Sequence, residues 1–160
     1  MTSDNASDQN DNAKVRIPPP LCFAAFLIAG LLLQSDWING EIGSGGRTLF
    51  GALLFAVSLC VIIKEALAHK KSGSNVEPWK PTTLILSTGL YAYSRNPIYV
   101  GMAFAYLGVA FAAGSFGAMA LLPFCLLVIY YRVIALEEAY LARKFGDEYL
   151  AYKQKIRRWL

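Results

Sequence analysis

Apolar residues dominate four stretches of the chain, and each stretch approaches the length of a membrane-crossing helix. The predicted spans cover residues 20–37, 48–68, 98–113 and 116–134. A helix needs about 20 predominantly apolar residues to cross a bilayer. From Asn96 to Tyr131, 36 consecutive residues carry no charge. The pattern therefore predicts an all-α fold, an integral membrane helical bundle with about four transmembrane helices.

Proline and glycine mark several boundaries of these spans. Three prolines at positions 18–20 precede the first span, where proline suits the first helical turn. Gly114 and Ser115 separate the third span from the fourth. Pro123 lies inside the fourth span and predicts a bend or a local break there.

The C-terminal segment carries a different pattern. Its apolar residues recur at steps of three and four, which is typical of one face of a helix; they are Leu141, Phe145, Tyr149, Tyr152, Ile156 and Trp159. Gly146 is expected to interrupt this helix, and Asp147 to cap the second piece. We therefore predict a cytoplasmic amphipathic helical segment after the fourth span.

Polar and basic residues set the expected organisation and topology. Residues 1–16 are mostly polar and predict a disordered cytoplasmic tail. Residues 17–160 then form a single membrane domain. Basic residues gather in the connection 69–97 and in the C-terminal segment. By the positive-inside rule, both termini and this connection are expected in the cytoplasm.

Composition excludes several classes of protein. Hydrophobic residues make up 56% of the chain and charged residues 16%, against about 25% charged in an average soluble domain. One water-soluble core of this size could not bury so much apolar surface. The net charge of +4 is local to loops, which speaks against nucleic acid as a partner. Three cysteines inside apolar runs and a single histidine predict neither a disulfide framework nor a metal site.

Two adjacent carboxylates, Glu137 and Glu138, occur where the fourth span ends. Neither has a Lys or Arg three or four residues away, so no salt bridge on the helix surface would hold them. Their partners must come from elsewhere in the fold or from a ligand. The alternative is that both face interfacial water.

A second candidate segment leads into the third span. Gly89 permits an unusual backbone angle, and Arg95 offers a planar donor fork that suits a carboxylate. Pro97 fits a helix start. The alternative is an ordinary junction between loop and helix with interfacial tyrosines. Small residues then recur along the third span, where helix packing is the default interpretation; they are Gly101, Ala105, Gly108 and Ala112.

The two candidate segments belong to the same side of the membrane. Two spans separate Arg95 from Glu137 and Glu138, so the chain returns to the side on which it started. An Arg beside a carboxylate pair can recognise a zwitterion, with Arg meeting its carboxylate and Glu its ammonium. An amino-acid-like ligand is therefore one hypothesis for this side.

The same residues carry a family resemblance, which covers residues 89–159. The chain resembles the isoprenylcysteine carboxyl methyltransferase and phospholipid methyltransferase superfamily of integral-membrane methyltransferases. The matching motifs are Gly89-Leu90-Tyr91, Arg95-Asn96-Pro97-Ile98-Tyr99-Val100-Gly101, Glu137-Glu138-Ala139-Tyr140-Leu141 and Phe145-Gly146-Asp147-Glu148-Tyr149-Leu150-Ala151-Tyr152. Two departures from the family pattern are Leu90, where proline is usual, and Asn96, where histidine is usual.

The resemblance implies that residues 17–160 are one membrane methyltransferase domain, with S-adenosylmethionine as cofactor in the half 89–160. It implies a cofactor site formed by Gly89, Tyr91, Arg95, Asn96, Pro97, Tyr99, Gly101, Glu137 and Glu138. Arg95 and Asn96 are the candidates for a catalytic contact, and no general base is named. The expected acceptor is lipophilic or amphiphilic, resembling an isoprenylcysteine carboxylate or a phospholipid amine, and it enters from the bilayer. Neither a metal nor a nucleic acid is expected.

Two alternative functions remain open at this stage. Membrane reductases of the sterol type share a similar C-terminal half and use NADPH. Their usual motif is His-Pro-Asn-Tyr, whereas this chain has Asn96-Pro97-Ile98-Tyr99. A non-catalytic membrane scaffold or small transporter is the other alternative. The third and fourth spans carry no charge before Arg132, which argues against a transport pathway.

Overall fold

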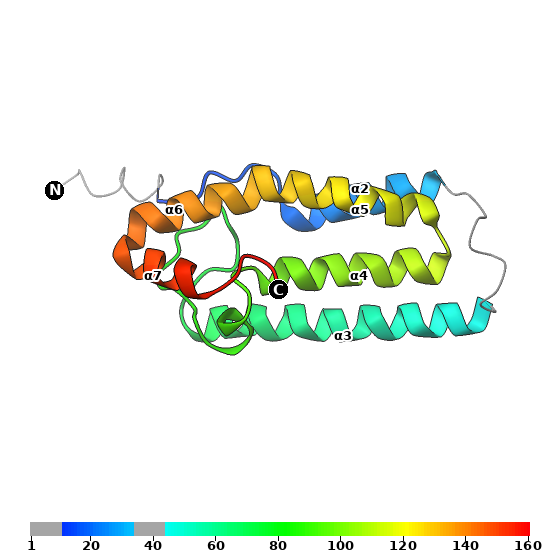
Figure 1. The fold of residues 1–160 in the computed structure, drawn as a ribbon, viewed down its shortest axis with the longest axis horizontal. Coiled ribbons are helices and arrows are strands. Elements are labelled where there is room, and N and C mark those ends of the chain that lie inside the picture. Colours follow the sequence, from blue (N-terminus) through cyan, green and yellow to red (C-terminus); the bar gives the residue numbers. More distant parts are fainter. Residues whose placement is uncertain (1–10, 34–43) are drawn as a thin grey trace.

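A computed structural model describes residues 11–33 and 44–160 of the chain, which form a bundle of helices (Figure 1). The helices are α2 (Pro19–Leu32), α3 (Ser44–Lys71), α4 (Pro97–Ala113), α5 (Phe116–Ile129), α6 (Ala135–Phe145) and α7 (Asp147–Lys155). Two short elements are the 3₁₀-helix η1 (Gly89–Ala92) and the π-helix η2 (Tyr130–Ile134). Within the described ranges no β-strand forms. The predicted all-α fold is confirmed.

Two of the helices are long and apolar enough to cross a membrane. One comprises residues 45–71 of α3, and the other is the continuous helix Phe116–Phe145. The helices α2 and α4 are apolar but shorter. Residues 34–37, the end of the first predicted span, lie outside the described residues.

Helix α3 presents its apolar side chains outward. Leu49, Val57 and Leu67 are 62%, 62% and 59% exposed, respectively. A helix that is apolar on its exposed face has no favourable place in water. The exposure of α3 therefore fits a helix surrounded by lipid rather than the core helix of a soluble domain.

The fourth predicted span, 116–134, is part of a longer continuous helix in the structure. The chain is helical without a break from α5 through η2 to α6, over 30 residues, and Pro123 lies inside α5. Of the two outcomes predicted for Pro123, the local break does not occur, and the bend stays a prediction. In apolar surroundings a break would leave several backbone groups without hydrogen bonds, whereas proline removes only one donor.

The ends of α4 and α6 behave largely as the glycines predict. Gly114 has a φ of 63°, and the Ser115 hydroxyl accepts a hydrogen bond from the Ala118 N–H at the start of α5. Gly146, with a φ of 54°, separates α6 from α7. The predicted cap by Asp147 is wrong, because Gly146 occupies the N-cap position. Asp147 instead lies in the first turn of α7, where its negative charge interacts favourably with the helix dipole.

The N-terminal segment is ordered further than the sequence predicted. Ala13 and Val15 are only 5% and 6% exposed, and both belong to the hydrophobic core. Asp11 forms an ion pair with Lys144 and accepts a hydrogen bond from the Tyr140 hydroxyl at 3.0 Å. The predicted disordered tail is therefore wrong for residues 11–15, because two alternating apolar side chains are enough to dock the segment. Residues 1–10 lie outside the described part.

Helix α3 packs beside α4, and α2 packs beside α5 (Figure 1). Glycines bring these backbones together. A Cβ added at Gly108 of α4 would lie 2.7 Å from the Gly51 carbonyl oxygen and 2.8 Å from the Phe55 nitrogen, both in α3. The small residues along α4 therefore allow α4 to pack closely against α3, in agreement with the interpretation of their spacing.

Gly108→Ala should destabilise the bundle. The added methyl group meets backbone atoms that cannot rotate away, and overpacking of this kind costs about 1–3 kcal/mol. Gly45→Ala is the matched control, because an added Cβ there meets no atom of the described residues within 4 Å. We expect a lower midpoint of thermal unfolding in detergent for Gly108→Ala alone. An equal midpoint in both variants would contradict the close approach of α3 and α4.

Candidate functional site

A cavity of about 210 Å³ lies at one end of the bundle. Figure 1 shows that the N-terminal segment, the connection between α3 and α4, and α6 with α7 all gather at this end. Residues from each of these parts line the cavity. The helices therefore act as a rigid support, and the loops and C-terminal helices build the site.

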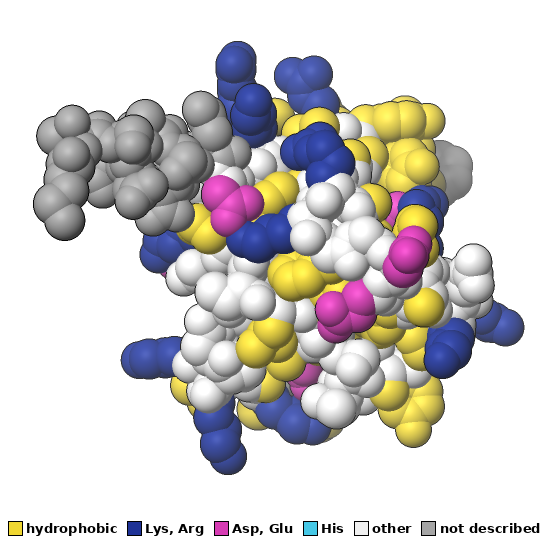
Figure 2. Space-filling model, turned by 90° about the vertical axis from the view of Figure 1, so that its left-hand side faces the viewer, with side chains coloured by type: hydrophobic (Ala, Val, Ile, Leu, Met, Phe, Trp, Pro, Cys, Tyr) yellow, Lys and Arg dark blue, Asp and Glu magenta, His cyan; other side chains and the backbone are white. Residues whose placement is uncertain are grey.

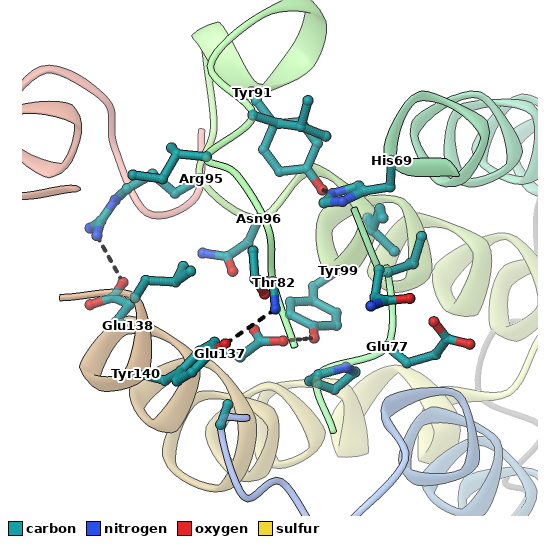
Figure 3. Close-up of a pocket in the computed structure, with 18 of the residues that line it drawn as sticks. His69, Glu77, Thr82, Tyr91, Arg95, Asn96, Tyr99, Glu137, Glu138 and Tyr140 are labelled. Carbon is teal, nitrogen blue, oxygen red and sulfur yellow. Dashed lines mark hydrogen bonds and ion pairs between the residues drawn. The ribbon is translucent and has the colours of Figure 1, made fainter. Parts of the chain in front are cut away.

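Six of the nine predicted cofactor residues line this cavity. They are Tyr91, Arg95, Asn96, Tyr99, Glu137 and Glu138 (Figure 3). They come from two segments that are about 40 residues apart in sequence. The two candidate segments thus meet in space, as the argument from chain direction predicted.

The other three predicted residues do not line the cavity. Gly89 is exposed and has a φ of 63°, so glycine there serves the backbone at the start of η1. Pro97 and Gly101 line a second, apolar cavity of about 310 Å³ between α3 and α4. A Cβ at Gly101 would lie 2.8 Å from Ile62 of α3, so this glycine allows α3 and α4 to approach.

Glu137 reaches into the cavity from the first turn of α6. The Tyr99 hydroxyl donates a hydrogen bond to its Oε1 at 2.8 Å (Figure 3). Tyr99 is only 8% exposed and stands in the first turn of α4. A neutral hydroxyl orients this carboxylate without cancelling its charge.

Glu138 is the centre of a network of ion pairs. Its carboxylate lies 3.0 Å from Arg95 Nη1 and 3.3 Å from Lys153 Nζ. Arg158 donates to both carboxylate oxygens, at 2.8 Å and 3.0 Å. These hydrogen bonds raise the pKa of the Arg158 guanidinium. We expected arginine to bind a ligand's carboxylate and both glutamates to be available for its ammonium. Glu138 instead pairs with Arg95, so Glu137 is the carboxylate that is left for the ammonium.

Asn96 uses its side chain within the protein. Its Nδ2 donates to the Arg158 carbonyl oxygen at 2.9 Å, and its backbone N–H donates to the Ser94 hydroxyl. Asn96 is 9% exposed and lies just before α4. The amide therefore ties the start of α4 to the C-terminal end of the chain.

Sequence reasoning missed the aromatic wall of the cavity. His69 Nε2 lies 2.8 Å from the Tyr91 hydroxyl, and the Tyr152 hydroxyl donates to the Tyr91 carbonyl oxygen at 2.7 Å. Burial raises the pKa of Tyr91, and nearby Glu137 raises it further. Burial also raises the pKa of Tyr152 to about 12. The sequence pattern identifies Tyr149 and Tyr152 only as part of an apolar helix face, and it assigns no contact to His69.

The cavity has an apolar part as well. Val76, Trp79, Leu84 and Leu86 of the long connection line it together with Met102 of α4. The site therefore offers charged and aromatic groups in one part and hydrocarbon surface in another. Such a combination can receive a polar ligand and an amphiphilic one side by side.

Tyr140 holds several of the lining segments together. Its hydroxyl accepts a hydrogen bond from the Thr82 N–H at 3.2 Å (Figure 3) and contacts Asp11 and Lys144. One side chain of α6 thus links the long connection and the N-terminal segment. Both segments contribute to the cavity wall, through Thr82 and Ala13 respectively.

The outer face of this end carries most of the basic side chains. Figure 2 shows Lys and Arg around its rim, with acidic side chains nearer the centre. Within residues 11–33 and 44–160 no group of three or more His, Cys, Asp or Glu side chains could hold a metal ion. The polar side chains that line the cavity include arginine, carboxylate and tyrosine groups.

Comparison with known families assigns the chain. Residues 46–148 match the phospholipid methyltransferase family, which is well over half of the 160 residues. The chain belongs to this family. The match covers α3 as well as the candidate segments, whereas sequence inspection found only hydropathy before residue 89. It ends in the first turn of α7, at residue 148, and does not include residues 149–160.

Two relatives extend this result. A protein-S-isoprenylcysteine O-methyltransferase from Schizosaccharomyces pombe is 38% identical over 73 residues, which are 46% of this chain and 31% of the relative. An uncharacterised protein from Haemophilus influenzae is 66% identical over 35 residues, 22% of this chain and 56% of the relative. The chain thus spans about a third to a little over half of the lengths of these relatives. The predicted superfamily is confirmed, and neither the reductase nor the scaffold alternative is favoured. No solved structure gives a significant match.

Proposed function

We propose that this protein transfers a methyl group from S-adenosylmethionine to a lipophilic or amphiphilic acceptor at the membrane. The observation that carries the proposal is the cavity, which joins charged and aromatic residues to an apolar wall in a chain of the methyltransferase family. The single methyltransferase domain would comprise residues 17–160, with the cofactor in the half 89–160.

The residues of the charged part fit the methionine end of this cofactor. Arg95 Nε is buried and has no hydrogen-bond partner among the described residues, so the guanidinium retains donor capacity for a carboxylate. Glu137 offers a carboxylate for the ammonium group, and the ring of Tyr91 provides an aromatic wall. Gly89, Pro97 and Gly101 would act indirectly, by shaping the backbone that carries Tyr91, Arg95 and Tyr99.

The cofactor supplies a methyl group that its sulfonium already activates. The protein then has to hold donor and acceptor in line and exclude water, which are effects of position and desolvation. Arg95 and Glu137 would fix the donor, and the buried tyrosines would keep water away from it. Asn96 stays a candidate for a catalytic contact because it lines the cavity, although its Nδ2 already donates to the Arg158 carbonyl oxygen.

The acceptor would lie against the apolar wall of the same cavity. Leu84, Leu86 and Met102 are among the apolar residues that line the cavity and could contact hydrocarbon. An acceptor of the isoprenylcysteine carboxylate or phospholipid amine class combines such hydrocarbon with a polar group to be methylated. A bilayer is the natural source of a molecule with this character.

Four membrane spans with both termini in the cytoplasm remain part of the proposal. The basic rim seen in Figure 2 surrounds the end where the N-terminal segment, the long connection and α7 gather, as the positive-inside rule requires of a cytoplasmic face. The α6 and α7 helices would then form the cytoplasmic segment next to the membrane.

Isothermal titration of the detergent-solubilised protein tests the proposed function. We expect S-adenosylmethionine and S-adenosylhomocysteine to bind, and NADPH not to bind. The Arg95, Lys153 and Arg158 side chains all pair with Glu138, so they do not form the uncompensated basic cluster that a phosphorylated ribose favours. Binding of NADPH without S-adenosylmethionine would replace the methyltransferase proposal with the reductase alternative.

Arg95→Lys should bind both methyl-donor ligands poorly although the charge is kept. Lysine is a point charge and cannot supply a planar two-pronged contact, and a charged hydrogen bond is worth about 1.5–3 kcal/mol. The measurement compares affinities of wild type and variant for S-adenosylmethionine and S-adenosylhomocysteine. Equal affinities would show that Arg95 does not meet the ligand's carboxylate.

Cysteine labelling checks the proposed topology. In a background with Cys22, Cys60 and Cys125 replaced by alanine, Gly45→Cys and Lys155→Cys mark the two ends of the bundle. A membrane-impermeant thiol reagent should label Lys155→Cys only from the cytoplasmic side and Gly45→Cys only from the opposite side. Labelling of both positions from one side would contradict the topology.

A further inference from the structure

The last five residues, 156–160, follow α7 and lie beside the loop that carries Arg95. We call them the C-terminal strap. The Arg95 N–H donates to the Arg157 carbonyl oxygen at 2.9 Å, and the Asn96 amide donates to the Arg158 carbonyl oxygen at 2.9 Å. Trp159 packs against the hydrophobic core. The strap thus holds the backbone of the loop that carries Arg95.

The Arg158 side chain of the strap holds the other partner of Arg95. Its planar fork donates to both oxygens of Glu138, and its guanidinium lies 4.9 Å from the centre of the Tyr130 ring. Glu138 in turn contacts Arg95 Nη1 at 3.0 Å. The strap therefore contacts Arg95 in two ways: directly, through the hydrogen bond to the Arg95 backbone N–H, and indirectly, through the Glu138 carboxylate that pairs with the Arg95 side chain.

We propose that Asn96 and Arg158 are positioning residues, which clamp the C-terminal strap onto the site and so hold the Arg95 guanidinium at the cavity. This inference rests on the proposed function, in which Arg95 meets the carboxylate of the methyl donor. Arg158 itself is not among the residues that line the cavity. Its effect on a ligand must therefore pass through Glu138 and Arg95.

The two adjacent carboxylates have different roles in this arrangement. Glu138 is 8% exposed and accepts from Arg95, Lys153 and Arg158, so it is the anchor of the clamp. Glu137 accepts from the neutral Tyr99 hydroxyl rather than from a basic side chain, and it lines the cavity, where it can accept a hydrogen bond from a ligand's ammonium. Two successive residues on a helix point about 100° apart, which lets one face the strap and the other the cavity.

Ligand binding to Arg158→Gln tests the clamp, with Arg157→Gln as the matched control. Arg157 is adjacent and exposed, so its replacement removes the same charge without removing the fork on Glu138. We expect Arg158→Gln to weaken S-adenosylhomocysteine binding about tenfold or more, the effect of one misplaced charged hydrogen bond. The control should bind as wild type does.

A second ligand separates positioning from general damage to the site. 5′-Methylthioadenosine shares the adenosine and the thioether of S-adenosylhomocysteine but has no amino-acid end. Its affinity should be the same in wild type and Arg158→Gln, because Arg95 does not act on it. A parallel loss of both affinities would overturn the positioning role, and so would unchanged binding of S-adenosylhomocysteine.

Hydrogen exchange measures the clamp without any ligand. In Arg158→Gln and in Asn96→Ala, the Arg95 amide should exchange faster than in wild type, whereas amides in the middle of α4 should not change. Wild-type protection of the Arg95 amide in both variants would refute the clamp. If wild-type protein bound no methyl-donor ligand, the proposed function would fail, and the exchange result would still decide whether the strap is clamped.

Discussion

The ion-pair network of Glu138 connects the parts of the chain that form the site. This buried carboxylate joins α6 to the loop before α4 through Arg95, to α7 through Lys153, and to the C-terminal residues through Arg158. Burying a charge is costly, and removal of one partner from a buried pair commonly costs about 3–5 kcal/mol. A buried Glu138 requires the basic groups of Arg95, Lys153 and Arg158 beside it. The segments that carry these three residues are therefore held in one arrangement at this end of the bundle.

The helices place Glu138 through their packing. Gly108 and Gly51 bring α4 against α3, and Ser115 bonds the Gly30 carbonyl oxygen at the opposite end of the bundle. The π-helix η2 then precedes the carboxylates. Because a π turn holds more residues than an α turn, it rotates everything that follows. The faces shown by Glu137 and Glu138 therefore depend on this one irregular turn.

The sequence predicted those features that depend on local patterns. Hydropathy located the apolar helices, Gly114 and Gly146 marked where helices end, and counting spans brought Arg95 and the two glutamates to one side. It could not predict η2, since a π turn leaves no periodic signal over five residues. It also missed the roles of His69 and Tyr152, because their partners lie 22 and 61 residues away along the chain.

The N-terminal segment shows why composition alone misjudged a part of the site. Residues 1–16 are polar on average, yet Ala13 and Val15 lie two apart and enter the core together. The Tyr140 hydroxyl adds a polar attachment at Asp11, while it also accepts from the Thr82 N–H. A polar segment is disordered only when its few apolar side chains have no apolar surface to pack against. Here the hydrophobic core contains both side chains. Tyr140 of α6 contacts Asp11 and Thr82, so the helix that carries the carboxylates also holds the segments around the cavity.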